Sequence, residues 1–294
     1  MLGQLFALLT AFCWAQNSVF YSIAGKRISS QSVTHIRLWI ALPAILIVHF
    51  IFQGSFYPSI TWTFPMVLLA ASGFIGFFVA DILIFYSFVA IGPGRTLLIM
   101  TLSPILSAVL SFFFLGESLR ILQSAGMLVT LAGILIVIYH ENKIEKIDSH
   151  ILKGIIIAVL GSVAQAAAMV LSKAGLSEGM HPISANVVRI TFGFAGLVIY
   201  TIVRGEFIND FKKMRDLKAL TLISIAALIG PVLGIILTLY ALQLAPVGIV
   251  TTLTQISPII LLPIEAIFLK RRITFWILTG TLVAVAGAVI LFMC

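Results

Sequence analysis

The chain has 294 residues, of which 61% are hydrophobic and only 10% are charged. This composition excludes a water-soluble globular protein of this length and indicates an integral membrane protein. The formal net charge of +8 does not indicate nucleic-acid binding, because the basic residues are scattered over short loops between apolar segments.

Ten apolar segments are each long enough for a helix that crosses roughly 30 Å of hydrocarbon, which requires about 20 residues. In chain order they cover approximately 2–24, 33–53, 65–90, 94–115, 120–140, 151–173, 182–203, 219–243, 246–269 and 273–293. These segments are apolar on every side, whereas the strands of a membrane barrel alternate apolar and polar residues. We therefore predict an all-α polytopic membrane protein with ten transmembrane helices and no soluble domain.

Two stretches of the sequence repeat one another without gaps, from Tyr86 to Val137 and from Tyr240 to Leu291. Paired residues at this one spacing include Gly94/Gly248, Pro104/Pro258, Gly126/Gly280 and Gly133/Gly287. We therefore predict two five-helix repeats, 1–140 and 151–294, joined by a linker at 141–150. Because five is an odd number of crossings, the two copies are expected to be inverted in the membrane around a central cavity, as in many secondary transporters.

The fourth and fifth predicted helices carry a pattern of proline, glycine, glutamate and glutamine. Its positions are Pro104, Gly116, Glu117, Gln123, Gly126 and Gly133. This pattern resembles the drug/metabolite transporter superfamily, in its ten-helix EamA-type branch. The second half keeps Pro258, Gly280 and Gly287, but Lys270 and Arg271 replace the Gly-Glu pair. The resemblance implies two inverted five-helix halves that move small solutes by alternating access.

Basic residues concentrate in the loops after the first, third, fifth, seventh and ninth helices, and the other loops hold only Arg120 and Lys173. By the positive-inside rule the odd-numbered loops face the cytoplasm. We therefore expect a multi-pass protein of the plasma (inner) membrane with both termini outside.

Pro104 and Pro258 lie near the middle of the fourth and ninth helices, where each proline frees the backbone carbonyl four residues earlier. Irregular backbone at membrane depth is tolerated against protein or a water-filled cavity. Either the kinks line a cavity or they serve packing alone, and the sequence leaves both interpretations open. Beside them, Thr101, Thr254 and Gln255 are candidate substrate-binding residues. Ser103, Ser107 and Ser111 form a helical stripe that is better explained by interhelical hydrogen bonding.

Four charged residues, Arg37, Asp81, Arg189 and Glu265, fall within the predicted spans, where a charge is expensive unless it faces protein or water. Asp81 could couple protons, pair with substrate, or form a salt bridge with Arg37 or Arg189. The two arginines are repeat partners, predicted to flank the cavity and bind carboxylate or phosphate bidentately. Snorkelling to the nearer interface is the alternative. We interpret Glu265 as part of an interfacial ion pair.

Further polar groups inside the predicted spans are Trp14 and Gln16 in the first helix and Gln165 in the sixth, which we list as candidate substrate-binding residues. The small multidrug branch of the superfamily uses a glutamate in its first helix, and Gln16 stands in that region here. This difference argues against that branch's cation mechanism. His35 and His49 are isolated in the sequence, so we predict no metal site and no cofactor.

The sequence thus predicts a secondary transporter of small polar metabolites, namely amino acids or similar carboxylates, by export or exchange, with protons as the candidate coupling ion. The alternatives are a drug or cation efflux pump and an accessory membrane scaffold or lipid flippase subunit. The sequence carries no recognisable catalytic motif, so an enzyme is not expected. Ten helices with both halves could form the whole pathway as a monomer.

Overall fold

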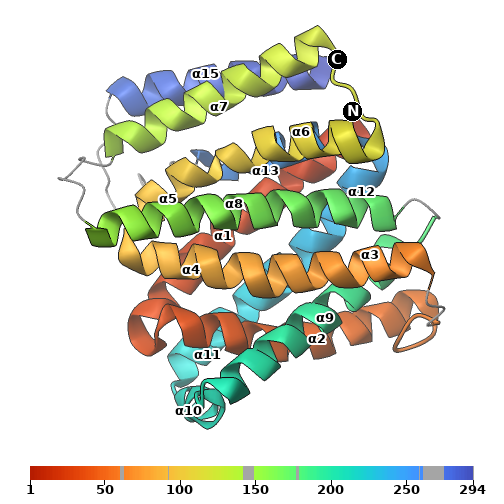
Figure 1. Ribbon diagram of the computed structural model, residues 1–294, viewed down its shortest axis with the longest axis vertical. Coiled ribbons are helices and arrows are strands. Elements are labelled where there is room, and N and C mark those ends of the chain that lie inside the picture. Colours follow the sequence, from red (N-terminus) through yellow and green to blue (C-terminus); the bar gives the residue numbers. More distant parts are fainter. Residues whose placement is uncertain are drawn as a thin grey trace.

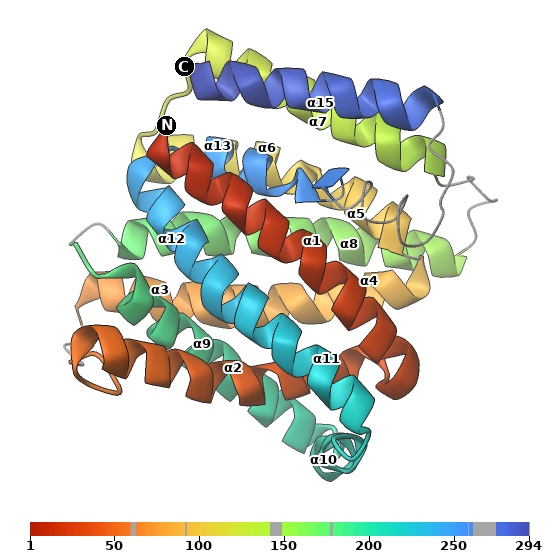
Figure 2. The ribbon, with the colours of Figure 1, turned by 180° about the vertical axis from the view of Figure 1, so that it is seen from behind.

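The computed structural model describes residues 1–59, 63–91, 93–141, 149–176, 179–257, 259–260 and 275–293. Every regular element in these ranges is helical. The long helices lie side by side, and both chain termini lie at the same end of the bundle (Figures 1 and 2). We call this the termini end, and we call the opposite end the linker end, because α7 finishes and α8 starts there.

The first half contains long helices, two of which are interrupted. One is interrupted by the π-helix η1, and the other is divided into α5 and α6. Its elements are α1 (Leu2–Ile28), α2 (Ser30–Gln53), α3 (Phe64–Gly73), the π-helix η1 (Phe74–Ala80), α4 (Asp81–Ala90), α5 (Pro93–Met100), α6 (Leu102–Leu115) and α7 (Ile121–Glu141). The segments α3, η1 and α4 follow one another without a break. At the end of α6, Gly116 adopts a φ of 66°, a left-handed conformation that glycine reaches without strain.

The second half has the same pattern and one addition. Its elements are α8 (Ser149–Gly175), α9 (Pro182–Val203), α10 (Phe207–Lys213), α11 (Leu217–Ala227), the π-helix η2 (Leu228–Gly234), α12 (Ile235–Leu244), α13 (Val247–Thr254) and α15 (Phe275–Met293). The two π-helices start at Phe74 and Leu228, which have the same spacing as Tyr86 and Tyr240. The addition is α10, a short helix at the linker end that occupies part of the predicted loop 204–218.

Among the residues that the structure describes, six helical segments are long and apolar enough to cross a membrane. They are Gln31–Gln53, Phe64–Ser87, Ile151–Gly175, Pro182–Val203, Leu217–Leu244 and Phe275–Met293. Leu102–Leu115 and Ile121–Ile136 are shorter apolar helices. A polytopic helical membrane protein is therefore the fold class, as predicted. The prediction of a span at 246–269 falls partly outside the described residues.

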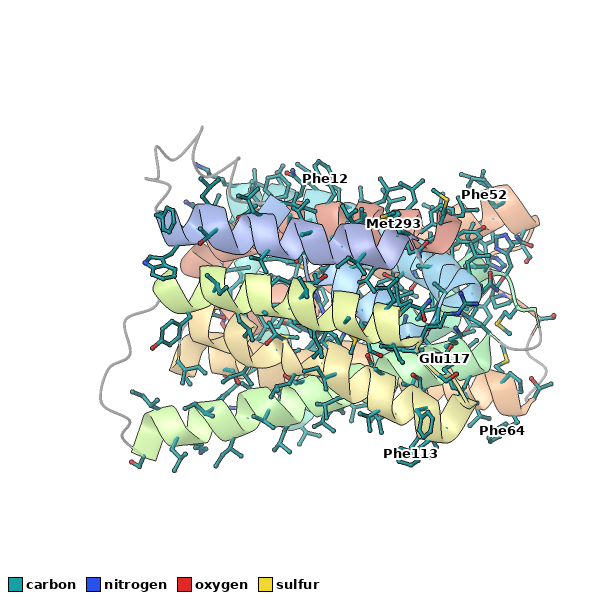
Figure 3. All side chains as sticks on the ribbon, turned by 90° about the horizontal axis from the view of Figure 1, so that it is seen from above. Phe12, Phe52, Phe64, Phe113, Glu117 and Met293 are labelled. Carbon is teal, nitrogen blue, oxygen red and sulfur yellow. The ribbon has the colours of Figure 1, made fainter. Side chains whose placement is uncertain are left out.

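Large apolar side chains cover the outside of the bundle. Phe12, Phe52, Phe64, Phe113 and Met293 all project outward and are exposed (Figure 3). Hydroxyl, amide and guanidinium groups are instead buried between helices. This distribution fits a lipid environment, because outward apolar side chains cost nothing in hydrocarbon while polar groups must find partners inside.

Glycines let α7 and α15 pack against each other as an antiparallel pair (Figure 2). A Cβ atom on Gly133 would lie 2.6 Å from the Gly280 carbonyl oxygen, and one on Gly287 would lie 2.8 Å from the Gly126 carbonyl oxygen. Only glycine permits so close an approach of the two backbones. The four glycines are the repeat pairs of the sequence, so each half contributes the same two positions to this contact.

The other helix contacts also pair elements of one half with corresponding elements of the other. Helix α1 packs against α11, η2 and α12, as α8 packs against α3, η1 and α4. Helix α2 packs against α9, and α6 packs against α13. The bundle therefore holds together through contacts between the halves as well as within them.

Candidate functional site

Arg37 and Asp81 form an ion pair inside the bundle. Arg37 lies about two turns into α2, and its Nη2 donates to Oδ2 of Asp81, the first residue of α4. The Arg37 side chain is 3% exposed, and its Cζ lies 5.8 Å from the centroid of the Tyr21 ring and 5.5 Å from that of Phe85. Of the interpretations open for Asp81, the structure thus places it in a salt bridge with Arg37.

Arg189 occupies the corresponding place on α9 without an acidic partner. It is 2% exposed, and its Nε and Nη1 atoms have no hydrogen-bond partner. Its Cζ lies 5.4 Å from the centroid of the Phe77 ring in η1. The backbone of Arg189 is packed so closely against Gly73 that no Cβ would fit there. Within the described part of the chain, no carboxylate forms an ion pair with this guanidinium.

Two helix breaks meet in the interior. Helix α5 ends at Met100 and α6 starts at Leu102, two residues before Pro104, so the Met100 carbonyl lacks its helical partner as predicted. Gln255, the residue after α13, donates from Nε2 to this carbonyl oxygen at 3.4 Å. Thr101, at the break itself, is buried. Gln255, a predicted site residue beside the helix break of the second half, therefore contacts the helix break of the first half.

The second break is described only in part. Helix α13 ends at Thr254, and Thr254 and Gln255 are half-buried. Pro258 and Glu265, which the sequence analysis singled out, lie outside the described residues, as do Lys270 and Arg271.

The serine stripe of α6 is buried and faces α13. Ser107 Oγ lies 2.7 Å from Thr251 Oγ1 across the two helices, and it also donates to the Pro104 carbonyl at 2.9 Å. Ser111 donates within its own helix. These contacts agree with the interpretation that the stripe packs helices together.

Trp14, Gln16 and Gln165 are half-buried near the middles of α1 and α8. Trp14 packs against the main hydrophobic cluster. Beside Gln16, Asn17 is 1% exposed, and neither Nδ2 nor Oδ1 has a hydrogen-bond partner. The sequence analysis did not select Asn17, although its place beside Gln16 in a mid-span polar run was an available signal.

Glu117 of the Gly-Glu pair holds the start of α13 at the termini end (Figure 3). Its Oε2 accepts from the Val247 backbone nitrogen at 2.9 Å, and its carboxylate forms an ion pair with Lys173. Lys173 Nζ also donates to the Ala245 carbonyl at 2.6 Å. A carboxylate at a helix N-terminus satisfies a free N–H and the helix dipole. Glu117 thus connects α6, α8 and α13, a role the sequence analysis missed.

A second polar cluster lies at the linker end, where α10 meets α2. Asp210 lies 2.6 Å from Ser32 Oγ through Oδ1 and 2.9 Å from His35 Nδ1 through Oδ2. Trp39 Nε1 donates to His35 Nε2 at 3.1 Å. Since indole nitrogen can only donate, His35 carries its proton on Nδ1 and donates it to Asp210. His35 is therefore not isolated, contrary to the prediction.

The pKa of Asp210 reflects two opposing effects. Burial raises it, but the hydrogen bonds from His35 and Ser32 and the charge of Lys213 outweigh burial, so the pKa lies below its usual range. The carboxylate is therefore ionised at neutral pH and is hydrogen-bonded to Ser32 and His35 of α2.

A cavity of about 210 Å³ opens beside this cluster. Its lining includes Thr34, Ile82, Phe85, Thr201, Arg204 and Lys213. Phe85 lines the cavity and also covers the guanidinium of Arg37. The cavity therefore reaches from the polar linker end to the neighbourhood of the Arg37–Asp81 pair.

The described interior contains one paired and one unpaired guanidinium, an amide at a helix break and buried hydroxyls, which are groups that can bind a polar solute. Within the described ranges no three His, Cys, Asp or Glu side chains gather as a metal site would require.

Comparison with known proteins gives three findings. The model of the EamA-like transporter family matches residues 1–139 and 152–293. An uncharacterized transporter of Bacillus subtilis (strain 168), YvbV, is 31% identical over 140 residues, which is 47% of this chain and 45% of that protein. The alignment thus spans under half of this curated relative. A crystal structure of another protein superposes with a TM-score of 0.76 over 99% of this chain and 98% of that one, at 18% identity, which supports the fold alone.

Proposed function

Because the chain belongs to the EamA-like transporter family, we propose that it is a secondary transporter that moves small polar metabolites by alternating access. This membership confirms the resemblance to the drug/metabolite transporter superfamily. The solutes that we propose are amino acids or similar carboxylates, moved by export or exchange across the plasma (inner) membrane. Protons are the proposed coupling ion, and one chain is proposed to form the whole pathway.

The proposed architecture is ten crossings in two inverted halves, 1–140 and 151–294, joined by the linker 141–150, around a central cavity. Three features support it. The π-helices share the spacing of the sequence repeat, the glycines of α7 and α15 contact each other in repeat pairs, and α1 and α8 have corresponding partners. The family match in two consecutive stretches agrees with this division.

The observation that carries the proposal is the contact between the two helix breaks. Gln255 of the second half donates to the carbonyl that the break at Thr101 leaves free. In transporters built from inverted repeats, substrate sites lie near the bilayer midplane where discontinuous helices meet. We therefore propose that solute binds beside this contact. The proposed site residues are Trp14, Gln16, Arg37, Asp81, Thr101, Gln165, Arg189, Thr254 and Gln255, with Pro104 and Pro258 setting the kinks.

A cation or drug efflux pump is less well supported. Asp81 is the carboxylate available within the described spans for binding a cation, and it is occupied by Arg37. A scaffold or lipid flippase subunit would not require the polar contact between the helix breaks.

Flux through liposomes that contain the purified chain tests the proposal. We expect uptake or exchange of at least one labelled amino acid or carboxylate, measured with and without a pH gradient. Gln255→Leu should reduce the flux by about tenfold or more, since it removes the partly buried hydrogen bond to the Met100 carbonyl. The matched control is Gln243→Leu, at the exposed end of α12, which should leave the flux unchanged. Absence of flux for every solute would overturn the transporter proposal and favour a scaffold.

The proposed orientation is tested by labelling single cysteines in intact cells, in a background without Cys13 and Cys294. Asn209→Cys at the linker end should react only after the cytoplasm is made accessible, and Ser55→Cys at the termini end should react from outside. Labelling of both positions from one side would contradict the proposed arrangement.

A further inference from the structure

Arg37 and Arg189 occupy equivalent positions, but among the described residues only Arg37 has an acidic partner. Each lies about two turns into its helix, α2 or α9, and each is buried. Arg37 is paired with Asp81. The residue of the second half at the spacing of Tyr86 and Tyr240 from Asp81 is Ile235, a buried member of the hydrophobic core. The sequence thus supplies an acid for the first arginine and an aliphatic side chain at the equivalent place for the second.

Among the described residues, no group around Arg189 compensates its charge. A Cβ atom built on Gly76 would lie 3.5 Å from Arg189 Nη2 and 3.2 Å from the Cβ of Ala168 on α8, so these neighbours are small and uncharged. The Phe77 ring is the described aromatic partner. A guanidinium does not lose its proton in proteins. A buried charge of this kind requires a counter-ion, and two of its three nitrogens still have donors to offer.

Arg189 lies beside a π-helix. Gly76 is in η1, and a side chain there would lie against the guanidinium. A π-helical turn within a longer helix frequently marks a functional site. An unpaired arginine, a glycine and a π-helical turn therefore lie together, and a small anionic group that reached this position could pair with the guanidinium.

We propose that Arg189 binds the carboxylate of the transported solute, at a position between η1, α8 and α9. This inference rests on the proposed function and narrows it, because it assigns recognition of the solute's carboxylate to one residue of the proposed site. The incoming group forms with Arg189 the ion pair that Asp81 already forms with Arg37. Solute binding accordingly neutralises the one buried arginine that the described part of the protein leaves unpaired.

The test is thermal unfolding of the full-length purified chain with pairs of probes that differ only in charge. The pairs are benzoate and benzamide, succinate and succinamide, and N-acetyl-leucine and N-acetyl-leucinamide, together with the free amino acids, all at one ionic strength. We expect at least one carboxylate to raise the Tm while its neutral amide does not, because only a ligand that binds the folded state stabilises it. If no carboxylate raises the Tm of the wild-type chain, the inference is wrong.

Two variants assign the effect to Arg189. Arg189→Gln should abolish the Tm shift, and Arg189→Lys, which keeps the charge, should bind about tenfold more weakly, since lysine cannot bind a carboxylate bidentately. The control is Arg27→Gln, a change of an exposed arginine that pairs with Asp216 and lies outside the proposed site, and this variant should retain the shift. Should Arg189→Gln not fold, Arg189→Lys decides alone, and binding equal to wild type would overturn the assignment.

Binding and flux together separate this inference from the proposed function. Carboxylate binding that depends on Arg189, without flux in liposomes, would support the site and refute transport. Flux that is unchanged in Arg189→Lys and Arg189→Gln would support transport and refute the site.

Discussion

The surroundings of Arg37 and Arg189 differ although the two residues occupy equivalent helices. Around Arg37, the carboxylate of Asp81 balances the charge and two aromatic rings lie beside the guanidinium, whose Nε has no hydrogen-bond partner. Around Arg189, one ring, a glycine and an alanine leave two nitrogens without partners. A complete buried ion pair needs no further partner, whereas a buried charge without a partner requires a counter-ion. This difference is the basis of the proposal that Arg189 binds the solute's carboxylate.

The largest expected effect follows from removing the acid of the complete pair. Asp81→Asn leaves Arg37 buried and unpaired, which costs about 3–5 kcal/mol of unfolding free energy. The measurement is unfolding of the purified protein in detergent. The double variant Arg37→Met/Asp81→Asn should recover most of that loss, because it removes the stranded charge. Equal stability of Asp81→Asn and the wild type would show that the pair is not formed in the folded protein.

Asp81→Asn also tests whether transport is coupled to protons through Asp81. In liposomes, Asp81→Asn is expected to abolish gradient-driven accumulation but to spare exchange, if Asp81 carries the coupling proton. Unchanged accumulation would eliminate it from that role.

Replacing Asp210, a carboxylate outside the membrane spans, should lower the unfolding free energy by a smaller amount. Asp210→Asn removes the charge and one of the two acceptor oxygens that bind Ser32 and His35, and hydrogen bonds to an ionised group are worth about 1.5–3 kcal/mol. Because the pKa of Asp210 is lower in the folded state than its unfolded value of about 3.9, its stabilisation is present above that value and is lost as the pH falls through the folded pKa.

Unfolding of Asp210→Asn and the wild type across a pH series checks this account. Their difference in stability should be constant near neutral pH and should shrink below about pH 4. A difference that stays unchanged in acid would mean that the carboxylate is not the stabilising form.

Replacing the unpaired Arg189 should raise the unfolding free energy, whereas replacing the paired Arg37 should lower it. Arg189→Met replaces a buried charge by an apolar chain of similar length, so the unfolding free energy without ligand should rise by about 1 kcal/mol or more. Arg37→Met, the matched control, strands Asp81 and should lower it. A loss of stability in Arg189→Met would indicate that Arg189 already has a partner in the folded protein.

The sequence predicts the local features of this molecule well. Apolar length predicts ten spans, and six of them coincide with described helices that are long and apolar enough to cross a membrane. The proline rule predicts the free carbonyl of Met100. The pairing of Asp81 was one of several interpretations, because a sequence shows that a buried charge needs a partner without showing which one is near. Arg37 and Arg189 looked alike for the same reason.

Features that depend on contacts between segments far apart in the chain could not be predicted from the sequence. Glu117 holds the start of α13, which lies far along the chain and whose first residue has no unusual sequence signal. His35 looks isolated because its partner Asp210 belongs to α10, a helix within a segment that reads as a loop. In both cases the residue type indicated chemistry, and only the fold supplied the partner.

The smallest expected change in stability comes from giving Arg189 the acid that it lacks. A Cβ atom built on Gly76 would lie 3.2 Å from Ala168 Cβ and 3.5 Å from Arg189 Nη2, so Ala168→Asp is designed to place a carboxylate near Arg189. The new ion pair offsets the cost of burying the new charge, and we expect the unfolding free energy to change by less than about 1 kcal/mol. The carboxylate-induced Tm shift should nevertheless disappear, because the site becomes as complete as that of Arg37. Ala168→Asn has the same shape without the charge and should keep the shift. If Ala168→Asp still responds to carboxylates as the wild type does, then the two arginines do not differ in the way that their surroundings indicate.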